Sequence, residues 1–385
     1  MRMKIAIIGH GVVGGGVHAL LEDGRLGISV KRVMDRQPMK GIEHLFTDNI
    51  AEIVGDREID CVVEATVGVH PALSFVMAAL SAGKHVVTSN KELLSLNFTQ
   101  LRDRAIAGGV QFFYSATAGG GVPWLHNLHR VKRGDTVLSV SGIVNGTTNF
   151  ILDAMARGDG FNEALTQAQR LGYAESNPTS DLLGLDSQRK CAISASIAFD
   201  TWINPEDIPT LGIGQVTAAD IAAFTARGLA CKLLMFAERA SDGVVAFVEP
   251  SLLPVDSLMA RTETNHNCIS LCAEYAGRLA FYGQGAGRYP TAHAIVQDLL
   301  DIQTKNFRKI RPITPMNVIN NLEKHPYYVR TGRLSKLPAT LCAERLGADA
   351  MITNPMTVEA AHALAVKALK MDPGAFFAGI PEMAW

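Results

Sequence analysis

The chain has 385 residues, of which 48% are hydrophobic and 19% are charged. Because this length exceeds the usual size of a single domain, we expect two or three packed units. The 36 lysine and arginine residues are balanced by 37 aspartate and glutamate residues, so no broad basic surface is expected. This balance disfavours nucleic acids and anionic membranes as partners, and it favours a small-molecule ligand.

The N-terminal segment indicates a cytoplasmic protein. Residues 1–4 run directly into an apolar strand, without the long apolar stretch and small-residue cleavage site of a secretory leader. Apolar runs such as residues 5–8 end well before the roughly 20 residues that cross a bilayer. The six cysteines are scattered along the chain, which favours reduced, mostly buried thiols. Cys268 and Cys272 follow His266 at a spacing that matches no usual zinc pattern.

The first part of the chain alternates short apolar runs with helical segments. Strands are expected at residues 4–8, 28–35, 61–65, 84–88 and 109–114. Such alternation is typical of an α/β fold with a doubly wound parallel sheet. Three glycines at 119–121 and then Pro123 break the pattern. We therefore expect a Rossmann-type, dinucleotide-binding domain over residues 1–125.

A second α/β domain is expected over residues 126–290. Its strands are expected at residues 137–144, 232–239, 244–250 and within 268–282, and its helices at residues 149–156, 161–171, 187–199 and 218–227. Pro290 then opens a periodic apolar helix over residues 291–302. The tail, residues 306–385, is expected to pack on the body or on a second subunit, through a helix at 358–369 and an aromatic end at Phe376, Phe377 and Trp385.

Three glycines, Gly9, Gly11 and Gly14, stand directly between a predicted strand and a predicted helix. A dinucleotide-binding turn requires this context. The first glycine permits the tight turn, the second lets the backbone approach a pyrophosphate, and the third lets the helix pack closely on the strand. Val12 and Val13 complete the candidate turn, whose free N–H groups attract phosphate. The alternative is a tight turn that binds no nucleotide.

Asp35 ends the second predicted strand, 21 positions after Gly14. A carboxylate near this spacing bonds to the ribose 2′-hydroxyl of NAD and disfavours the 2′-phosphate of NADP. Arg36 and Lys40 follow closely and favour the opposite choice, because they can accommodate that phosphate. The sequence leaves NAD and NADP both open, with NAD the favoured cofactor.

Lys91 lies just past the end of a predicted strand, where ligands gather in doubly wound sheets. A loop lysine is more often a solvated surface charge, so its position alone establishes no role. Thr66 and Asn90 occupy comparable positions at strand ends. We treat all three residues as candidates for contact with the cofactor.

The stretch of residues 171–190 gathers carboxylates and a lysine around a helix entrance. The carboxylates are Glu175, Asp181 and Asp186, and the lysine is Lys190. Asp186 and Lys190 share one face of a helix because they are four positions apart, and an exposed ion pair is the simplest interpretation. If this face lines a cleft, the lysine can exchange a proton with a substrate hydroxyl while the carboxylates hold a substrate ammonium group.

Several blocks together make the sequence resemble the homoserine dehydrogenase family. They stand in the family's order between residues 1 and 302, at residues 87–92, 118–123, 142–150, 171–190 and 283–291. The resemblance implies an enzyme that interconverts L-homoserine and L-aspartate 4-semialdehyde by hydride transfer with NAD or NADP. It also implies that residues 126–290 form a substrate-binding, catalytic and dimerisation domain, and that the protein is a homodimer.

The resemblance assigns roles to the candidate residues. Lys190 would exchange the proton at the substrate oxygen, and Lys91 would lie beside the cofactor and the substrate. Glu175, Asp181 and Asp186 would hold the amino acid. These roles require the amines of Lys91 and Lys190 to converge beside the nicotinamide ring.

Further positions follow from the same resemblance. A loop beside the nicotinamide and substrate would contain Asn145, Gly146 and Thr147. Gly285 and Ala286 would form a turn from which residues 291–305 return to the nucleotide-binding domain as a helix.

In this family, the backbone carbonyls of a glycine-rich turn can hold a monovalent cation. The matching carbonyls in this sequence are those of Ala118, Gly120 and Val122. Ser115 stands where the family commonly has a glutamate, which removes negative charge that would favour a cation. The tail does not match the small threonine-sensing module of many relatives. We therefore expect no feedback through such a module.

Two other functions remain open from the residues alone. One is a related two-domain oxidoreductase that acts on a different amino or hydroxy acid. The other is a binding protein that senses nicotinamide nucleotides without turnover. The presence of both lysines together with three carboxylates argues against the second alternative.

Overall fold

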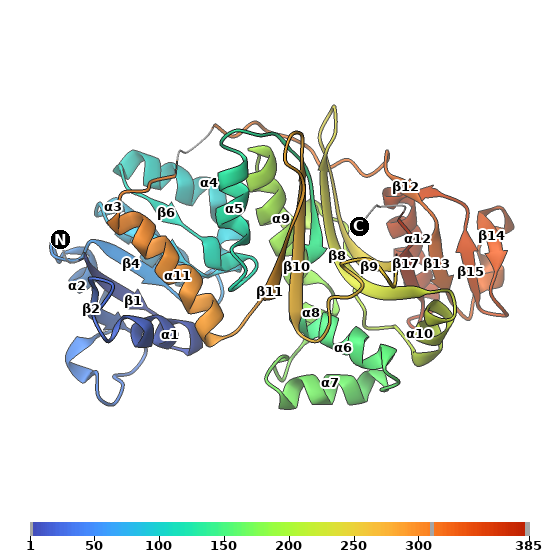
Figure 1. Ribbon diagram of the computed structural model, residues 1–385, viewed down its shortest axis with the longest axis horizontal. Helices are drawn as coiled ribbons and strands as arrows, with labels where there is room; N and C mark the ends of the chain where they lie inside the picture. The colour runs from blue at the N-terminus through green and yellow to red at the C-terminus, as the bar shows by residue number, and fades with distance from the viewer. Residues whose placement is uncertain (1–2, 309–311, 382–385) are drawn as a thin grey trace. The chain divides into compact units, whose positions relative to one another are not determined.

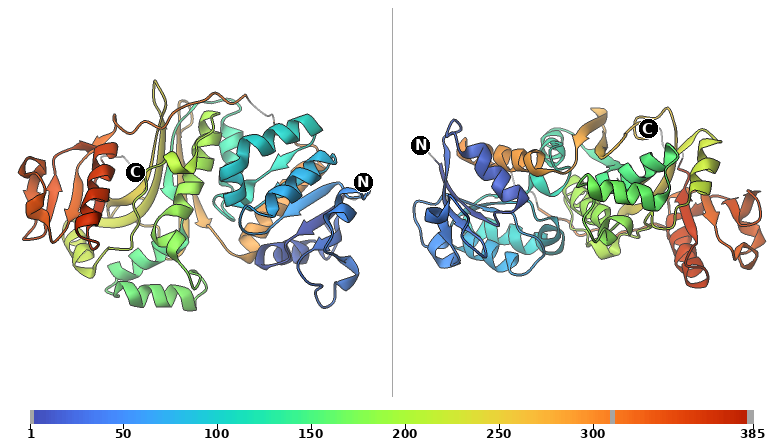
Figure 2. Two further views of the ribbon diagram at one scale, coloured as in Figure 1. Left: turned by 180° about the vertical axis from the view of Figure 1, so that it is seen from behind. Right: turned by 90° about the horizontal axis from the view of Figure 1, so that it is seen from below.

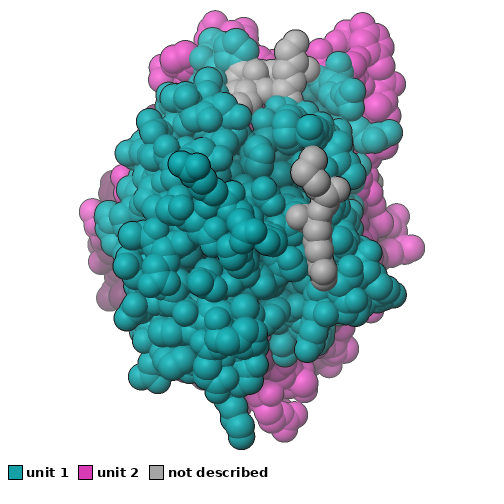
Figure 3. Space-filling view, turned by 90° about the vertical axis from the view of Figure 1, so that its left-hand side faces the viewer, with its two compact units in different colours: residues 1–133, 283–314 teal, residues 134–282, 315–385 magenta. Residues whose placement is uncertain are grey.

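The computed structural model describes residues 3–308 and 312–381 of the chain. Two compact units are present, coloured separately in Figure 3: unit 1 comprises residues 1–133 and 283–314, and unit 2 comprises residues 134–282 and 315–385. In the described part of the chain, no helix combines the length and the apolar character that a membrane span needs. Met1 and Trp385, which the sequence analysis considered, lie outside the described residues.

Unit 1 is built on a six-stranded parallel sheet with the order β3-β2-β1-β4-β5-β6 (Figure 1). The strands are β1 (Met3–Ile8), β2 (Ile28–Met34), β3 (Phe46–Thr47), β4 (Cys61–Glu64), β5 (His85–Thr88) and β6 (Phe112–Phe113). The helices are α1 (Val12–Leu21), α2 (Ile50–Val54), α3 (Ala72–Ser81), α4 (Lys91–Gly108), α5 (Trp124–Val131) and α11 (Arg288–Gln303). Strands β1 and β4 are short, apolar and almost wholly buried, as a parallel sheet covered on both faces requires. The predicted Rossmann-type fold is confirmed.

The last strand of this sheet is shorter than the sequence indicated. We expected residues 109–114 to be extended, whereas β6 covers Phe112–Phe113. Gly109 instead ends α4 in the left-handed conformation, with φ of 64°. Its N–H group bonds to the carbonyls of Ala105 and Ile106, so Gly109 belongs to the helix terminus.

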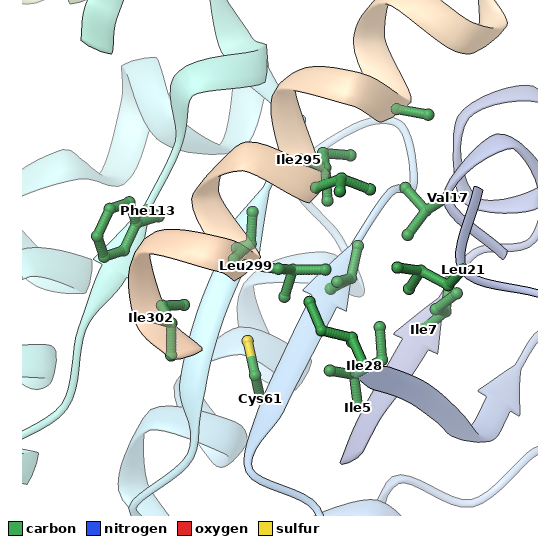
Figure 4. Close-up of a cluster of buried hydrophobic side chains, with 14 of the residues drawn as sticks. Ile5, Ile7, Val17, Leu21, Ile28, Cys61, Phe113, Ile295, Leu299 and Ile302 are labelled. Carbon is green, nitrogen blue, oxygen red and sulfur yellow. The ribbon is translucent and has the colours of Figure 1, made fainter. Parts of the chain in front are cut away.

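Helix α11 packs in the core of unit 1, although it lies more than 150 residues after the other helices of that unit. Ile295, Leu299 and Ile302 point from α11 into the cluster of buried side chains that also contains Ile7 and Val17 (Figure 4). Full burial of an isoleucine or leucine contributes about 1.5–3 kcal/mol relative to exposure. This apolar face therefore holds α11 against the sheet and α1.

Unit 2 contains a nine-stranded mixed sheet with the order β11-β10-β7-β8-β9-β17-β13-β15-β14. Its first five strands in chain order are β7 (Val137–Ile143), β8 (Leu229–Arg239), β9 (Val244–Pro254), β10 (His266–Ala273) and β11 (Gly277–Gln284). The helices before β8 are α6 (Gly146–Ala156), α7 (Phe161–Arg170), α8 (Thr179–Leu182), α9 (Leu185–Phe199) and α10 (Ala218–Thr225). Strand β7 pairs in antiparallel fashion with β10 and with β8.

The tail extends this sheet. Its elements are β12 (Lys324–His325), β13 (Tyr327–Arg330), β14 (Cys342–Arg345), β15 (Ala350–Thr353), β16 (Met356–Thr357), α12 (Val358–Met371) and β17 (Phe376–Gly379). Strand β17 joins the sheet next to β9, with Gly379 opposite Ser251. Helix α12, red in Figures 1 and 2, packs Ala361, Ala365 and Ala368 over the apolar face of the added strands.

Two buried carboxylates tie the tail to the rest of unit 2. Asp220 of α10 accepts hydrogen bonds from the Tyr328 hydroxyl and the Arg330 Nε, both at 2.7 Å. Glu249 of β9 accepts from His325 at 2.9 Å, from His362 at 2.8 Å and from the Tyr327 hydroxyl at 3.2 Å. Both carboxylates are fully buried, so each depends on the partners that the tail supplies.

The charge state of the Glu249 cluster follows from these contacts. Burial alone would raise the pKa of Glu249, but the hydrogen bonds from His325 and His362 outweigh burial and lower it. Burial would likewise lower the pKa of His325, but the bonds to Glu249 and Glu323 raise it to about 9. The stabilisation from His325 is therefore complete below its unfolded pKa of about 6.5 and is lost as the pH rises through about 9.

We expect Glu249→Gln to lower the free energy of unfolding by about 3 kcal/mol at pH 6, because it leaves the buried His325 without its counter-charge. Chemical denaturation at pH 6 and pH 9.5 measures this change. The wild-type protein should lose stability between the two pH values, and the variant should lose less. Glu359→Gln, at an exposed position of α12, is the matched control and should behave as wild type. Equal pH dependence in Glu249→Gln and wild type would contradict the assignment.

Candidate functional site

The glycine turn of unit 1 has the backbone geometry that a dinucleotide needs. Gly9 has φ of 86°, and a Cβ atom there would lie 2.7 Å from Thr66 Cγ2. A Cβ at Gly14 would lie 1.9 Å from the Gly9 carbonyl oxygen, so neither position accepts a side chain. Gly11, directly before α1, faces open space with nothing within 4 Å of its would-be Cβ. Its backbone and the start of the helix, Val12 and Val13, are thus open to a phosphate group.

Asp35 is held at the end of β2 by the same turn. Its two carboxylate oxygens accept hydrogen bonds from the backbone N–H groups of His10 and Arg36, both at 2.7 Å. Each oxygen keeps a further lone pair, so Asp35 can also accept from ribose hydroxyls. The side chains of Arg36 and Lys40 are exposed.

The side chain of His10 pairs with His18 of α1, a contact that the sequence analysis did not foresee. The His10 Nε2 and His18 Nδ1 atoms lie 2.9 Å apart. Burial and the neighbouring His18 lower the pKa of His10, and burial also lowers the pKa of His18. Both rings are therefore neutral near pH 7, and they add no positive charge to this side of the turn.

Glu64 is a buried hub at the carboxyl end of β4. It is fully buried and accepts hydrogen bonds from the Thr66 backbone N–H at 2.8 Å and from the Thr88 hydroxyl at 2.5 Å. The Asn90 side-chain amide lies 3.5 Å from the same carboxylate. Glu64 therefore ties together the two loops that follow β4 and β5. In the sequence, Glu64 is a lone charge at the end of the apolar run of residues 61–63, which does not by itself indicate its partners.

Lys91 is positioned by the residue before it. Asn90 caps α4, because its side-chain oxygen accepts a hydrogen bond from the Leu93 N–H at 3.0 Å. The Asn90 amide also donates to the Gly68 carbonyl at 2.7 Å. Lys91 is consequently the first residue of α4, half-buried, at the carboxyl end of the parallel sheet. Ligands of doubly wound folds bind at this end.

In unit 2, the side-chain amide of Asn145 joins two carboxylates. Its nitrogen donates to Asp181 at 2.7 Å and to Asp186 at 2.9 Å. Its oxygen accepts from the Thr148 N–H at 2.9 Å and so caps α6. The cap also explains why α6 begins at Gly146, three residues before the helix that we expected.

Lys190 completes this cluster. Its ammonium lies 2.7 Å from Asp186 and donates to the Val144 carbonyl at 2.6 Å. Lys190 and Asp186 are buried, with 9% and 6% of their surfaces exposed. The pair is therefore not the exposed surface ion pair that was the simplest interpretation of its spacing. A buried ion pair of this kind must be held by further hydrogen bonds, which Val144 and Asn145 supply.

The remaining predicted residues of unit 2 lie around the start of α6. The Thr147 hydroxyl donates to the Tyr173 carbonyl at 2.5 Å, which fixes the loop that leads to Glu175. Glu175 itself is exposed, and its carbonyl accepts from the Gln169 side chain at 3.1 Å. A Cβ at Gly146 would lie 2.5 Å from the Asn265 carbonyl oxygen, so only glycine fits there.

A buried lysine that the sequence analysis overlooked supports the start of α6. Lys232 of β8 is 3% exposed, and burial lowers its pKa. Its ammonium donates to the Asn149 side-chain oxygen at 2.9 Å and to the Thr262 carbonyl at 2.7 Å. The Asn149 amide donates in turn to the carbonyls of Thr262 and Thr264, at 3.0 and 2.9 Å. Lys232 and Asn149 thereby hold the loop at 262–266 against α6.

The glycine-rich turn of unit 1 lies against the start of the α11 segment. Gly120 has φ of 54°, and a Cβ there would lie 2.2 Å from the Gly285 carbonyl oxygen and 2.9 Å from the Ala286 nitrogen. Ala118 and Val122 are buried, and the Val122 carbonyl accepts from the Trp124 N–H at 2.7 Å. In the described part of the chain, no group of three or more His, Cys, Asp or Glu side chains is arranged to hold a metal ion.

The predicted residues thus divide between the two units. Unit 1 contains the glycine turn, Asp35, Thr66, Asn90, Lys91 and the turn at Gly285 and Ala286. Unit 2 contains Asn145, Gly146, Thr147, Glu175, Asp181, Asp186 and Lys190. Lys91 and Lys190 therefore belong to different units.

Comparisons with known proteins identify the family of the chain. The model of the NAD-binding domain of homoserine dehydrogenase matches residues 9–115, and the model of homoserine dehydrogenase matches residues 123–300. The homoserine dehydrogenase of Corynebacterium glutamicum is 40% identical over 314 residues, which cover 77% of this chain and 71% of that protein.

Solved structures of homoserine dehydrogenases also resemble this chain. The crystal structure of a homoserine dehydrogenase from Thiobacillus denitrificans has a TM-score of 0.87 and 30% identity, with 98% of both chains covered. A hyperthermophilic archaeal homoserine dehydrogenase in complex with NADPH has a TM-score of 0.69 over 81% of this chain and all of that chain. Its identity is 22%, so this second likeness concerns the fold.

We expect Lys232→Met to loosen the start of α6, because it removes the donor to two buried oxygens, each costly to leave unbonded at about 1–3 kcal/mol. Hydrogen–deuterium exchange should show faster exchange at residues 146–149 and 262–266, and the melting temperature should fall. Lys336→Met, at an exposed position of unit 2, is the control. Unchanged exchange in both segments would show that Lys232 does not hold this loop.

Proposed function

Since the chain belongs to the homoserine dehydrogenase family, whose members interconvert L-homoserine and L-aspartate 4-semialdehyde with NAD or NADP, we propose that Lys190 exchanges the substrate proton. The contacts of its buried ammonium with Asp186 and Val144 carry the proposal. The family matches do not favour the two alternatives, a dehydrogenase for another acid or a sensor without turnover.

The reaction needs a group that handles a proton. Oxidation of homoserine removes a hydride from carbon and a proton from oxygen, and a bound nicotinamide supplies chemistry for the hydride. An ammonium has three donors, and in Lys190 two of them point to Val144 and Asp186. The third can bond to the substrate oxygen, donating a proton to the aldehyde and, once deprotonated, accepting one from the alcohol.

The carboxylates beside Lys190 suit the other end of the substrate. Asp181 and Asp186 share the Asn145 amide, so their negative charge is concentrated at one place. A substrate ammonium group is attracted to such a place. We propose that Asp181, Asp186 and the exposed Glu175 bind the amino group, and that Gly146 and Thr147 border the substrate.

Lys91 is the second lysine that we propose to act in the active site. Asn90 places it at the carboxyl end of the unit 1 sheet, the end at which ligands bind in this fold class. We propose that Lys91 and Lys190 face one active site when cofactor and substrate are bound. The cofactor would lie over Gly9, Gly11 and Gly14, next to Thr66.

We expect Lys190→Ala to lower kcat by about 10²–10⁴-fold, the usual loss on removal of a general acid–base group. The assay follows NADH or NADPH formation from homoserine at 340 nm with purified protein. Nicotinamide affinity should stay within about threefold of wild type, because it depends on the glycine turn. Lys367→Ala, at an exposed position of α12, should keep wild-type kcat.

The double variant Lys91→Ala/Lys190→Ala tests whether the two amines serve one site. Groups that act as a unit give non-additive losses, so the double variant should lose little more activity than the more damaged single variant. Fully multiplied losses would place the two lysines in independent roles. Absence of homoserine-dependent reduction by wild type with either cofactor would contradict the proposed function itself.

NAD is the proposed cofactor. Asp35 presents a carboxylate beside the glycine turn, and such a group accepts from ribose hydroxyls but repels a 2′-phosphate. The neutral His10 and His18 pair adds no charge that would attract that phosphate. Arg36 and Lys40 are exposed and point to NADP as the alternative, and one structural relative was solved with NADPH.

We expect Asp35→Ser to raise the ratio of kcat/KM for NADP to that for NAD by about tenfold or more, which corresponds to about 1.4 kcal/mol of removed repulsion. Asp48→Ser, at an exposed position of unit 1, should leave the ratio unchanged. A wild-type enzyme with higher kcat/KM for NADP would reverse the proposed preference.

We also propose that the protein is a homodimer that acts in the cytoplasm on small molecules. Its support is the family resemblance, which implies association through the catalytic unit. Light scattering of the purified protein should give twice the mass of the chain, and the mass of one chain would contradict it.

A further inference from the structure

A buried carboxylate lies where the chain departs from its family. Asp298 of α11 is fully buried and accepts hydrogen bonds from Ser115, from the backbone N–H at 2.8 Å and from the hydroxyl at 2.7 Å. Ser115 begins the short 3-10 helix Ser115–Thr117, which leads directly into the glycine-rich turn. A carboxylate is therefore present next to position 115, although it comes from a segment 183 residues further along the chain.

Arg308 neutralises this carboxylate. One of its guanidinium nitrogens lies 2.8 Å from Asp298 and donates to the Ser115 hydroxyl oxygen at 2.5 Å. The guanidinium carbon lies 4.3 Å from the centre of the Phe113 ring and 5.5 Å from that of Tyr114. A guanidinium between aromatic faces and a buried carboxylate is held by charge and by stacking together.

The oxygens at this place do not fit a bound metal ion. The Ser115 hydroxyl oxygen and the Asp298 carboxylate both face the Arg308 guanidinium, and a second cation beside them would be repelled. The charges of Asp298 and Arg308 cancel, so no net negative charge remains to hold Na⁺ or K⁺. Of the three carbonyls expected to bind a cation, that of Val122 accepts the Trp124 N–H and keeps one further lone pair.

We propose that Arg308 supplies, from within the chain, the positive charge that the family resemblance assigns to a monovalent metal ion at the base of the glycine-rich turn. The arginine is a tethered cation that joins the segment after α11 to Ser115 and to α11 itself. Unit 1 then reaches its working conformation without added Na⁺ or K⁺. The stability measurements below do not depend on the proposed reaction, so they separate a failure of this inference from a failure of the enzyme assignment.

The first test uses the wild-type protein. Its melting temperature is measured in NaCl, in KCl and in tetramethylammonium chloride at equal ionic strength up to about 0.2 M, where specific ion binding is distinguished from screening. The three salts should give melting temperatures within about 1 °C, and kcat should agree within about twofold. A saturable rise of several degrees in Na⁺ or K⁺ alone, or tenfold activation by either, would overturn the proposal.

The second test removes the Arg308 side chain, so that a small cation can take its place beside Asp298. Arg308→Ala leaves Asp298 buried without its counter-charge, so the melting temperature should fall by several degrees. Guanidinium chloride at about 10 mM, or Na⁺, should restore part of the loss in a saturable manner. Urea at the same concentration is the control for the denaturant effect of guanidinium. Arg308→Ala/Asp298→Asn should lose the response, because no charge remains to be compensated.

Lys305→Gln is the matched control variant, since Lys305 is an exposed cation on the same segment. It should melt like wild type and respond to no ion. Absence of any ion response in a folded Arg308→Ala would show that the arginine does not occupy a cation's role, and would overturn the proposal. If Arg308→Ala does not fold, the wild-type salt series decides between the two outcomes.

Discussion

The acidic site of unit 2 depends on one side-chain amide, that of Asn145. Two carboxylates, Asp181 and Asp186, lie close to the same nitrogen, an arrangement that repulsion between like charges would otherwise oppose. The opposite end of the amide caps α6. One residue therefore fixes the start of α6, the position of α8 and the position of α9 relative to one another. Because Lys190 bonds to Asp186 and to the residue before Asn145, its ammonium is placed by the same constraint.

Buried carboxylates organise the molecule well beyond this site. Glu64, Asp220, Glu249 and Asp298 are all completely buried, and each accepts hydrogen bonds from segments distant in the chain. A buried charge without partners is costly, so each carboxylate makes the correct docking of its partners a condition of folding. In unit 1 these links shape the loops at the carboxyl end of the sheet. In unit 2 they bind the tail to α10 and β9.

The tail shows how a catalytic fold can be extended without an added domain. The family model ends at residue 300, yet the structural likeness to the Thiobacillus denitrificans enzyme covers 98% of this chain. The tail strands continue the sheet of unit 2 beyond β9, and α12 covers one face of that extension. Its stability therefore depends on the rest of unit 2, through backbone pairing at Gly379 and through the two carboxylates of α10 and β9.

Much of the candidate site could be predicted from the sequence, because the motifs that indicate it span only a few residues. The glycine turn after β1 and the spacing of Asp186 and Lys190 on one helix face are signals of this kind. Glu64, Lys232 and Asp298 gave no comparable signal, since a lone charge in or beside an apolar run has no partner until a distant segment packs against it. Their partners lie up to 183 residues away in the chain. Tertiary packing determines these partners, because every buried charge needs hydrogen bonds within a close-packed interior. Periodicity along the chain carries no information about which distant residues become these partners.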